Sequence, residues 1–163
     1  MGRKFAQIQL SIWSDPDFKS LDRDLQHTFF VLLSQPRINL CGVLDYRPRR
    51  LAQCAGDWPV DDVERDIKEL EARRYVVVDR DTDEMLIRSF IRHDGLLTQP
   101  NVAQGMSADY GEVMSDKLRD VIEAELRRAY LDDPDLKGWV GGDGLGGVKK
   151  GNPILYRRVV MTP

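Results

Sequence analysis

The segment LAQCAGDWPVDDVERDIKELEARRYVVVD, residues 51–79, constrains the fold more than any other part of the chain. Its second half predicts a helix of about 59–74, because apolar residues recur there at helical spacing, at Val60, Val63, Ile67 and Leu70. A shorter helix of about 48–55 comes before the turn DWP, and Pro48 suits its first turn because no amide hydrogen is needed there. A β-rich run follows at 75–78. The segment therefore predicts two helices joined by a tight turn and followed by a strand.

The residues before this segment predict a strand, a helix and a second strand. The run FAQIQLSIW, residues 5–13, alternates apolar and polar residues, which predicts a strand with Phe5, Ile8, Leu10 and Ile12 as candidates for burial. Trp13 is expected in the core. Asp22 is a suitable N-cap for a helix over about 23–35. Residues 38–46 then predict a short strand or extended segment.

After the segment, residues 85–91 are a second β-rich run, which predicts a hairpin with 75–78. Arg88 and Arg92 are expected on one face of this last strand. The order of elements is strand, helix, strand, helix, helix, hairpin. That is the order of a winged helix-turn-helix, and the predicted fold class is therefore α+β of this type.

Beyond residue 100 the sequence predicts a helical C-terminal extension. The runs NVAQGMSADYGEVM and SDKLRDVIEAELRRAY predict two helices, the second with an amphipathic stripe at Leu118, Val121, Ile122, Glu125 and Leu126. The expected organisation is a winged-helix domain at 1–99, the extension at 100–138 and a Gly-rich flexible tail at 139–163, with Trp139 docking the tail. The two helices either cover the open face of the winged helix or pair with a second copy, giving a homodimer through 101–131.

Residues 5–95 resemble a known group of proteins. The similarity lies in QIQLSIWSDPDF, LDRDLQHTFFVLLSQP, GVLDYRPRRLAQCAG, the segment 51–79 and RSFIRHDGLLTQPNV, with RSFIRHDG after the hairpin the most distinctive. The chain resembles small winged-helix proteins of phages infecting actinobacteria, and the N-terminal winged-helix modules of phage replication-initiation and replisome-organiser proteins. The resemblance implies a nucleic-acid context, with a role in replication initiation or in regulation of transcription. It also implies a location in the bacterial host cytoplasm.

A winged helix commonly binds duplex DNA, and basic residues are expected at the contacts. The candidate DNA-binding residues are Arg47, Arg49, Arg50, Trp58, Arg65, Lys68 and Arg80. The cluster RPRR, residues 47–50, would contact phosphates from the first helix of the motif. Arg65 and Lys68 would enter or flank the major groove, and Arg80 would contact the minor groove or backbone from the wing. Trp58 either fills the turn as a hydrophobic plug or stacks on the DNA backbone.

The second helix of the motif is acidic where a DNA-reading helix is usually basic. Asp61, Asp62 and Asp66 are expected to be exposed and would repel phosphate. The formal net charge of −3 also weighs mildly against DNA. The alternative is a protein-interaction adaptor that uses this helix to bind a replication, transcription or host factor. If the arginines share one surface and the acids point away, DNA is favoured; an exposed acidic face favours the adaptor.

The sequence does not favour an enzyme, a cofactor or a membrane partner. No apolar run reaches the roughly 20 residues that a membrane helix needs. The glycines of the tail have the spacing of a phosphate loop, but Val148 stands where its lysine would be. Cys41 and Cys54 have no metal-site spacing with His27 or His93, so two reduced core thiols in a cytoplasmic protein and no metal are expected.

Overall fold

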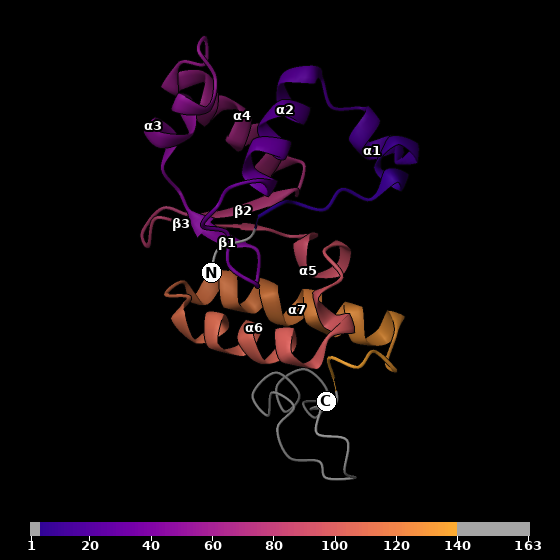
Figure 1. Ribbon diagram of the computed structural model, residues 1–163. Coiled ribbons are helices and arrows are strands. Elements are labelled where there is room, and N and C mark those ends of the chain that lie inside the picture. Colours follow the sequence, from indigo (N-terminus) through magenta and orange to yellow (C-terminus); the bar gives the residue numbers. More distant parts are fainter. Residues whose placement is uncertain (1–3, 140–163) are drawn as a thin grey trace.

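The computed structural model describes residues 4–139, and at residues 100, 103 and 104 the backbone alone. The fold is α+β, with a small three-stranded antiparallel sheet between two groups of helices (Figure 1). The strands are β1 (Val43–Asp45), β2 (Val76–Asp79) and β3 (Glu84–Ile87), in the order β1-β3-β2. Met85 in the central strand is opposite Leu44 of β1 and Val78 of β2. The predicted hairpin is therefore confirmed, with β1 added at its β3 edge.

One face of the sheet packs on the N-terminal helices, which are α1 (Pro16–Lys19), α2 (Arg23–Leu33), α3 (Pro48–Leu51) and α4 (Val60–Ala72). Asp22 caps α2 as predicted, since its carboxylate accepts from the Leu25 amide at 2.9 Å. α3 continues into a short 3₁₀ helix at Ala52–Cys54, so the predicted helix of 48–55 has two parts. The core on this side includes Leu32, Ile67 and Met85.

The opposite face is covered by the C-terminal helices, which are α5 (Phe90–His93), α6 (Pro100–Glu112) and α7 (Asp116–Asp132), with a 3₁₀ helix at Leu96–Thr98. Strand residues alternate between the two sides: Val43 and Leu86 belong to this second core, whereas Leu44 and Met85 belong to the first. Both helices of the extension are confirmed. Apolar residues of both helices share a core with Val43 and Leu86 within one copy of the chain. Figure 1 shows α6 and α7 together on this side of the sheet.

The predicted strand at residues 5–13 is wrong. Leu10–Ser14 form a 3₁₀ helix, and Phe5 and Leu10 are 72% and 83% exposed. Alternation alone does not make a strand: the carboxylate of Asp15 caps α1, with Pro16 at its first position, so the chain turns into a helix directly after this run. Trp13 is not a core residue either, because it is 54% exposed and its ring packs edge-on against Phe18 at 5.9 Å between centroids.

The predicted strand at 85–91 is too long, and Arg88 and Arg92 do not share a strand face. β3 ends at Ile87, whose amide donates to the carbonyl of Gly42 just before β1 begins. The Arg88 amide still donates to the carbonyl of Tyr75, just before β2, and after that the backbone hydrogen bonds become helical, as from the His93 amide to the Ser89 carbonyl.

The two cysteines have different environments. Cys41 is buried, and burial together with Asp109 raises the pKa of its thiol to about 12. Cys54 is exposed, so the prediction of two core thiols is wrong for that residue, which lies at the end of its 3₁₀ helix rather than on its inner face. The predicted tail lies outside the described residues except for Trp139, which is buried against Tyr130. In the described range, no helix is long and apolar enough to cross a membrane.

Candidate nucleic-acid interface

The arginines of RPRR lie at the start of α3. Pro48 begins the helix, and the next turn exposes Arg49 and Arg50 to solvent. Within residues 4–139, neither of these two guanidiniums has an ion-pair or hydrogen-bond partner. Arg47 is also exposed, but its Nε lies 3.5 Å from the carboxylate of Asp45. α3 therefore presents two uncommitted cations and one that is weakly paired.

Arg80 lies at the same edge of the molecule as the start of α3. Its guanidinium is 5.4 Å from the ring centroid of Tyr46, the residue next to Arg47. The Tyr46 amide donates to the carbonyl of Asp83 in the β2–β3 turn at 2.7 Å, which ties this turn to the beginning of α3. Figure 1 shows α3 and the β2–β3 turn on the same side of the molecule. The structure thus brings together Arg80 and the arginines of α3.

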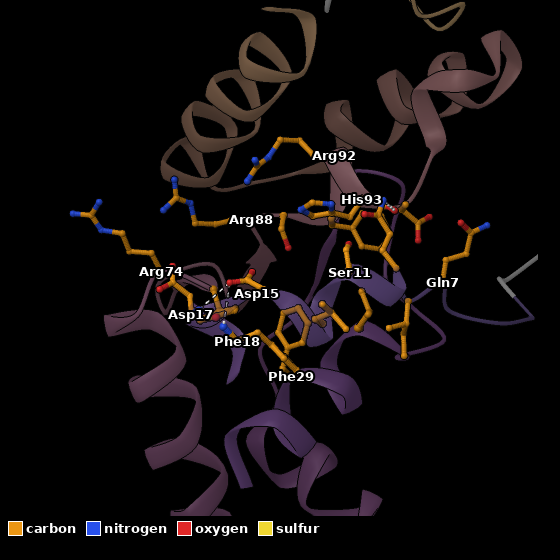
Figure 2. Close-up of a pocket in the computed structure, with 18 of the residues that line it drawn as sticks. Gln7, Ser11, Asp15, Asp17, Phe18, Phe29, Arg74, Arg88, Arg92 and His93 are labelled. Carbon is orange, nitrogen blue, oxygen red and sulfur yellow. Dashed lines mark hydrogen bonds between the residues drawn. The ribbon is translucent and has the colours of Figure 1, made fainter. Parts of the chain in front are cut away.

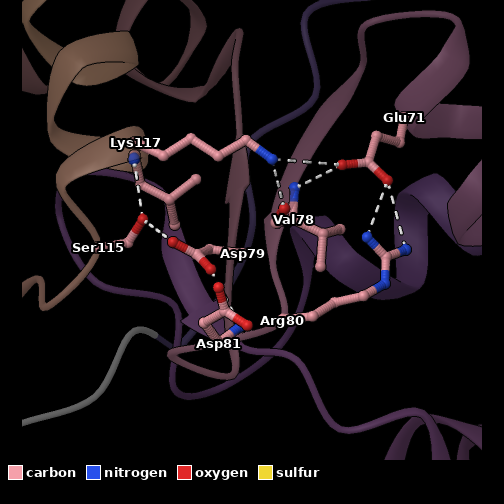
Figure 3. Close-up of polar contacts among 8 residues, drawn as sticks. Glu71, Val78, Asp79, Arg80, Asp81, Ser115 and Lys117 are labelled. Atoms are coloured by element: carbon pink, nitrogen blue, oxygen red, sulfur yellow. Dashed lines mark hydrogen bonds and ion pairs between the residues drawn. The ribbon is translucent and has the colours of Figure 1, made fainter.

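Arg80 is not free, however. Both terminal nitrogens of its guanidinium lie 3.3 Å from the Glu71 carboxylate of α4 (Figure 3). Half of the Arg80 side chain remains exposed, so the pair is hydrated, and exposed pairs of this kind are worth only about 0–1 kcal/mol. An incoming phosphate could therefore compete with Glu71 for this guanidinium.

Arg65 of α4 is committed to neighbouring acids. Its guanidinium lies 2.6 Å from the Asp62 carboxylate and 3.1 Å from that of Asp66. The Asp66 hydrogen bond and both carboxylates raise the pKa of Arg65, while desolvation lowers it. Lys68 is exposed and makes no ion pair within residues 4–139. Of the two cations predicted for groove contact, only Lys68 is uncommitted.

The expectation that Asp66 is exposed is wrong. Asp66 is 3% exposed, and its carboxylate accepts from the Thr28 hydroxyl and the Trp58 indole, each at 3.2 Å, as well as from Arg65. These three donors replace the water that the carboxylate loses on burial. Because Asp66 points inward, it repels a bound phosphate less than an exposed acid would.

Trp58 occupies the turn between α3 and α4 and packs there as a plug. Its indole N–H is used by Asp66, and its ring meets the His27 ring edge-on at 5.2 Å between centroids. The ring is half-buried rather than enclosed.

Two acids remain exposed on α4 near its start, Asp61 and Glu64. Neither forms an ion pair within residues 4–139. The surface of α4 therefore alternates in charge, with Asp61 and Glu64 beside Arg65 and Lys68. The sequence left two alternatives open, arginines on one surface with the acids pointing away, or an exposed acidic face on α4. The structure matches neither fully, because the basic edge is formed by α3 and Arg80 while the exposed face of α4 carries both charges.

The β2–β3 hairpin is held in place by the start of α7 (Figure 3). The Ser115 hydroxyl, which also caps α7, donates to the Asp79 carboxylate at 2.5 Å. The Lys117 ammonium donates to the Val78 carbonyl at 2.8 Å, and the carboxylate of Glu84 accepts from the Ser115 amide at 2.7 Å. These contacts fix the strand that leads into Arg80, and only the N-cap position of Ser115 was visible in the sequence.

Sequence reasoning also missed a second group of charges on the opposite side. Glu125 of α7 is 1% exposed and lies within ion-pair distance of Arg88, Arg92 and Arg128. Its place in the apolar stripe of the predicted helix was a usable signal, because a carboxylate on a buried face needs cationic or hydrogen-bonding partners. The two arginines expected on a strand face, Arg88 and Arg92, are instead its partners.

A comparison of the chain with protein-family models, with curated proteins and with solved structures finds no match.

Proposed function

We propose that this protein is a winged helix-turn-helix protein that binds duplex DNA without catalysis, through α3, α4 and the β2–β3 hairpin. The arrangement supports this assignment: two short-linked helices, α3 and α4, pack together, and a β2–β3 hairpin follows them directly. In such a fold the hairpin is the wing, and α4 is the helix that approaches the major groove.

One observation carries the proposal. Arg49 and Arg50 are exposed cations without partners in the described range, and they share an edge with Arg47 and Arg80. Unpaired guanidiniums at one edge are suited to phosphate oxygens, and each phosphate contact releases a counterion. Because Arg65 is neutralised by acids, we expect contacts to the DNA backbone to contribute more to affinity than base reading by α4.

The test is fluorescence anisotropy of labelled duplex and single-stranded DNA across a salt series. For about four phosphate contacts, the slope of log Kobs against log salt is expected near −4. The double variant R49A/R50A should reduce the magnitude of that slope by about 2. R23A/R127A is the matched control, because both residues are exposed cations without described partners and lie on α2 and α7. Equal slopes for the two double variants would refute the proposed interface.

A separate observation favours the adaptor function: the carboxylates of Asp61 and Glu64 are exposed and form no ion pair in the described part of the chain. In this alternative a basic partner protein, such as a replication, transcription or host factor, docks on α4. D61N/E64Q should then abolish capture of that partner while R49A/R50A leaves it unchanged. The same D61N/E64Q variant should bind DNA slightly more tightly if α4 faces DNA, because two repelling charges are removed.

The biological context is proposed from the resemblance to phage winged-helix proteins, which favours replication initiation over regulation of transcription, in the cytoplasm of a bacterial host. The proposal includes a homodimer, although the apolar residues of α6 and α7 belong to the core of a single copy. Sedimentation analysis with and without duplex DNA tests it: a dimer would have to use the outer surfaces of α6 and α7.

A further inference from the structure

A pocket of about 840 Å³ lies where residues 7–15, α5 and α7 meet (Figure 2). Pockets for small molecules are typically about 300–1,000 Å³, so this one is large enough for an organic ligand. α5 and α3 lie on different sides of the molecule in Figure 1, which separates the pocket from the edge formed by α3 and Arg80.

Three arginines that line the pocket carry more positive charge than the one carboxylate among them, Glu125, can neutralise. The Glu125 carboxylate lies 3.1 Å from Arg88 Nη2, 3.0 Å from Arg92 Nε and 3.3 Å from Arg128 Nη1. One negative charge among three guanidiniums leaves this group with an excess of two positive charges. His93 adds none near neutral pH, because burial and the neighbouring Arg92 lower its pKa.

Three polar atoms of residues that line the same pocket are buried without a hydrogen-bond partner in the described part of the chain. Two are donors, Arg88 Nε and the Tyr75 hydroxyl, and the third is the acceptor Glu125 Oε2, which has Arg92 Nε at ion-pair distance, 3.0 Å. Buried donors in folded proteins are nearly always satisfied, so such a pair requires an explanation. Burial and the nearby Asp15 and Asp17 raise the pKa of Tyr75, so its hydroxyl keeps its proton and can donate.

We propose that this pocket binds a small phosphate monoester, with the phosphoryl group held by Arg88, Arg92 and Arg128. The dianionic phosphoryl group of a monoester matches the excess of two positive charges. Figure 2 shows Asp15 and Asp17 across the pocket from Arg92, where they can accept hydrogen bonds from hydroxyls of the organic part. The same two carboxylates disfavour a polyphosphate, and a duplex backbone cannot enter deeply enough to reach the buried Arg88 Nε.

The test is isothermal titration calorimetry of the full chain in phosphate-free buffer, with inorganic phosphate, ribose 5-phosphate and uncharged ribose as probes. R128Q removes one charge-assisted contact at a side chain that is 58% exposed, so the fold is retained. It should weaken ribose 5-phosphate binding at least tenfold. R127Q is the matched control from the adjacent, exposed position on α7 and should bind as the wild type does.

The Y75F variant tests whether the Tyr75 hydroxyl contacts the ligand or only stabilises the fold. The Tyr75 hydroxyl has no protein partner in the described range, so Y75F should keep the thermal midpoint of the free protein while weakening ribose 5-phosphate about fivefold. No binding of either phosphate probe up to about 10 mM, or equal losses in R128Q and R127Q, would overturn the proposal. The proposal would also be overturned if R128Q lost affinity for duplex DNA while R128Q and Y75F both bound ribose 5-phosphate as the wild type does, because the arginines would then be a DNA contact.

Discussion

Replacing Glu125 by alanine is expected to destabilise the protein strongly. The carboxylate is 1% exposed and joins α7 to Arg88, just after β3, and to Arg92 in α5. Without it, three guanidiniums of like charge remain close together, and Arg88, whose side chain is 23% exposed, can recover only part of its hydration from water. Arg92 and Arg128 are more exposed and should be hydrated more readily.

Removing one partner of a buried ion pair typically costs about 3–5 kcal/mol. Since two of the three arginines have access to water, we expect the lower end for E125A, about 3 kcal/mol of unfolding free energy. For a chain of this size that corresponds to a fall in Tm of about 6–12 °C. Urea denaturation followed by circular dichroism measures the free energy directly, and the slope with urea should be unchanged if the native fold is kept.

The matched control is E112A, which removes an exposed glutamate at the end of α6 and should change stability by less than about 0.5 kcal/mol. A double-mutant cycle between E125A and R88A then isolates the pair, with an expected coupling above about 1 kcal/mol. A loss below about 1 kcal/mol in E125A, or no coupling to Arg88, would refute the view that this carboxylate holds the extension to the sheet.

Three further predictions follow from the backbone and from the hairpin contacts. G42A should lose about 2–4 kcal/mol in urea denaturation, because φ is +84° there and a Cβ would lie 2.6 Å from the Cβ of Phe90. R74G should raise the free energy of unfolding by about 0.5–1 kcal/mol, because Arg74 has a φ of +65° directly after α4, where glycine is unstrained. Hydrogen bonds from the Ser115 hydroxyl and, second, from the Asp81 amide lower the pKa of Asp79. The contribution of Asp79 to stability should therefore be complete above the ordinary aspartate pKa of about 3.9 and be lost as pH falls through the lowered pKa of the folded protein. The urea midpoints of the wild type and D79N should accordingly converge as pH falls from about 5 to 2.5, and a constant difference would contradict this.

The elements that the sequence predicted well are those whose signals are local. α2 and α4 combine helical periodicity with defined starts, Asp22 as an N-cap for α2 and the turn DWP before α4. α6 and α7 are likewise specified by their own sequences. The basic edge was also predictable in part, because Pro48 forces a helix to begin within RPRR and thereby exposes Arg49 and Arg50.

What the sequence could not provide depends on partners distant along the chain. Asp66 has the spacing of a flanking position on α4, and only Thr28, 38 residues earlier, and Trp58 show that it is buried. The alternation at residues 5–13 predicts a strand only if a neighbouring strand is free to pair with it, and no local signal reports that. The partners of Asp66 and the lack of a strand partner for residues 5–13 both depend on how distant parts of the chain pack together. The periodicity of a short segment gives no information about such packing.

The position of the hairpin explains why the extension matters even if it makes no contact with a partner. The network at the start of α7 fixes β2 through Val78 and Asp79, and Glu84 at the start of β3 accepts from the backbone between α6 and α7. β3 is the central strand, so this support reaches β1 and the first turn of α3. The backbone that carries the arginines of α3 and Arg80 is therefore held in place before any ligand arrives. A surface fixed in this way loses less conformational entropy on binding, so the helices of the extension can raise affinity without touching the ligand themselves.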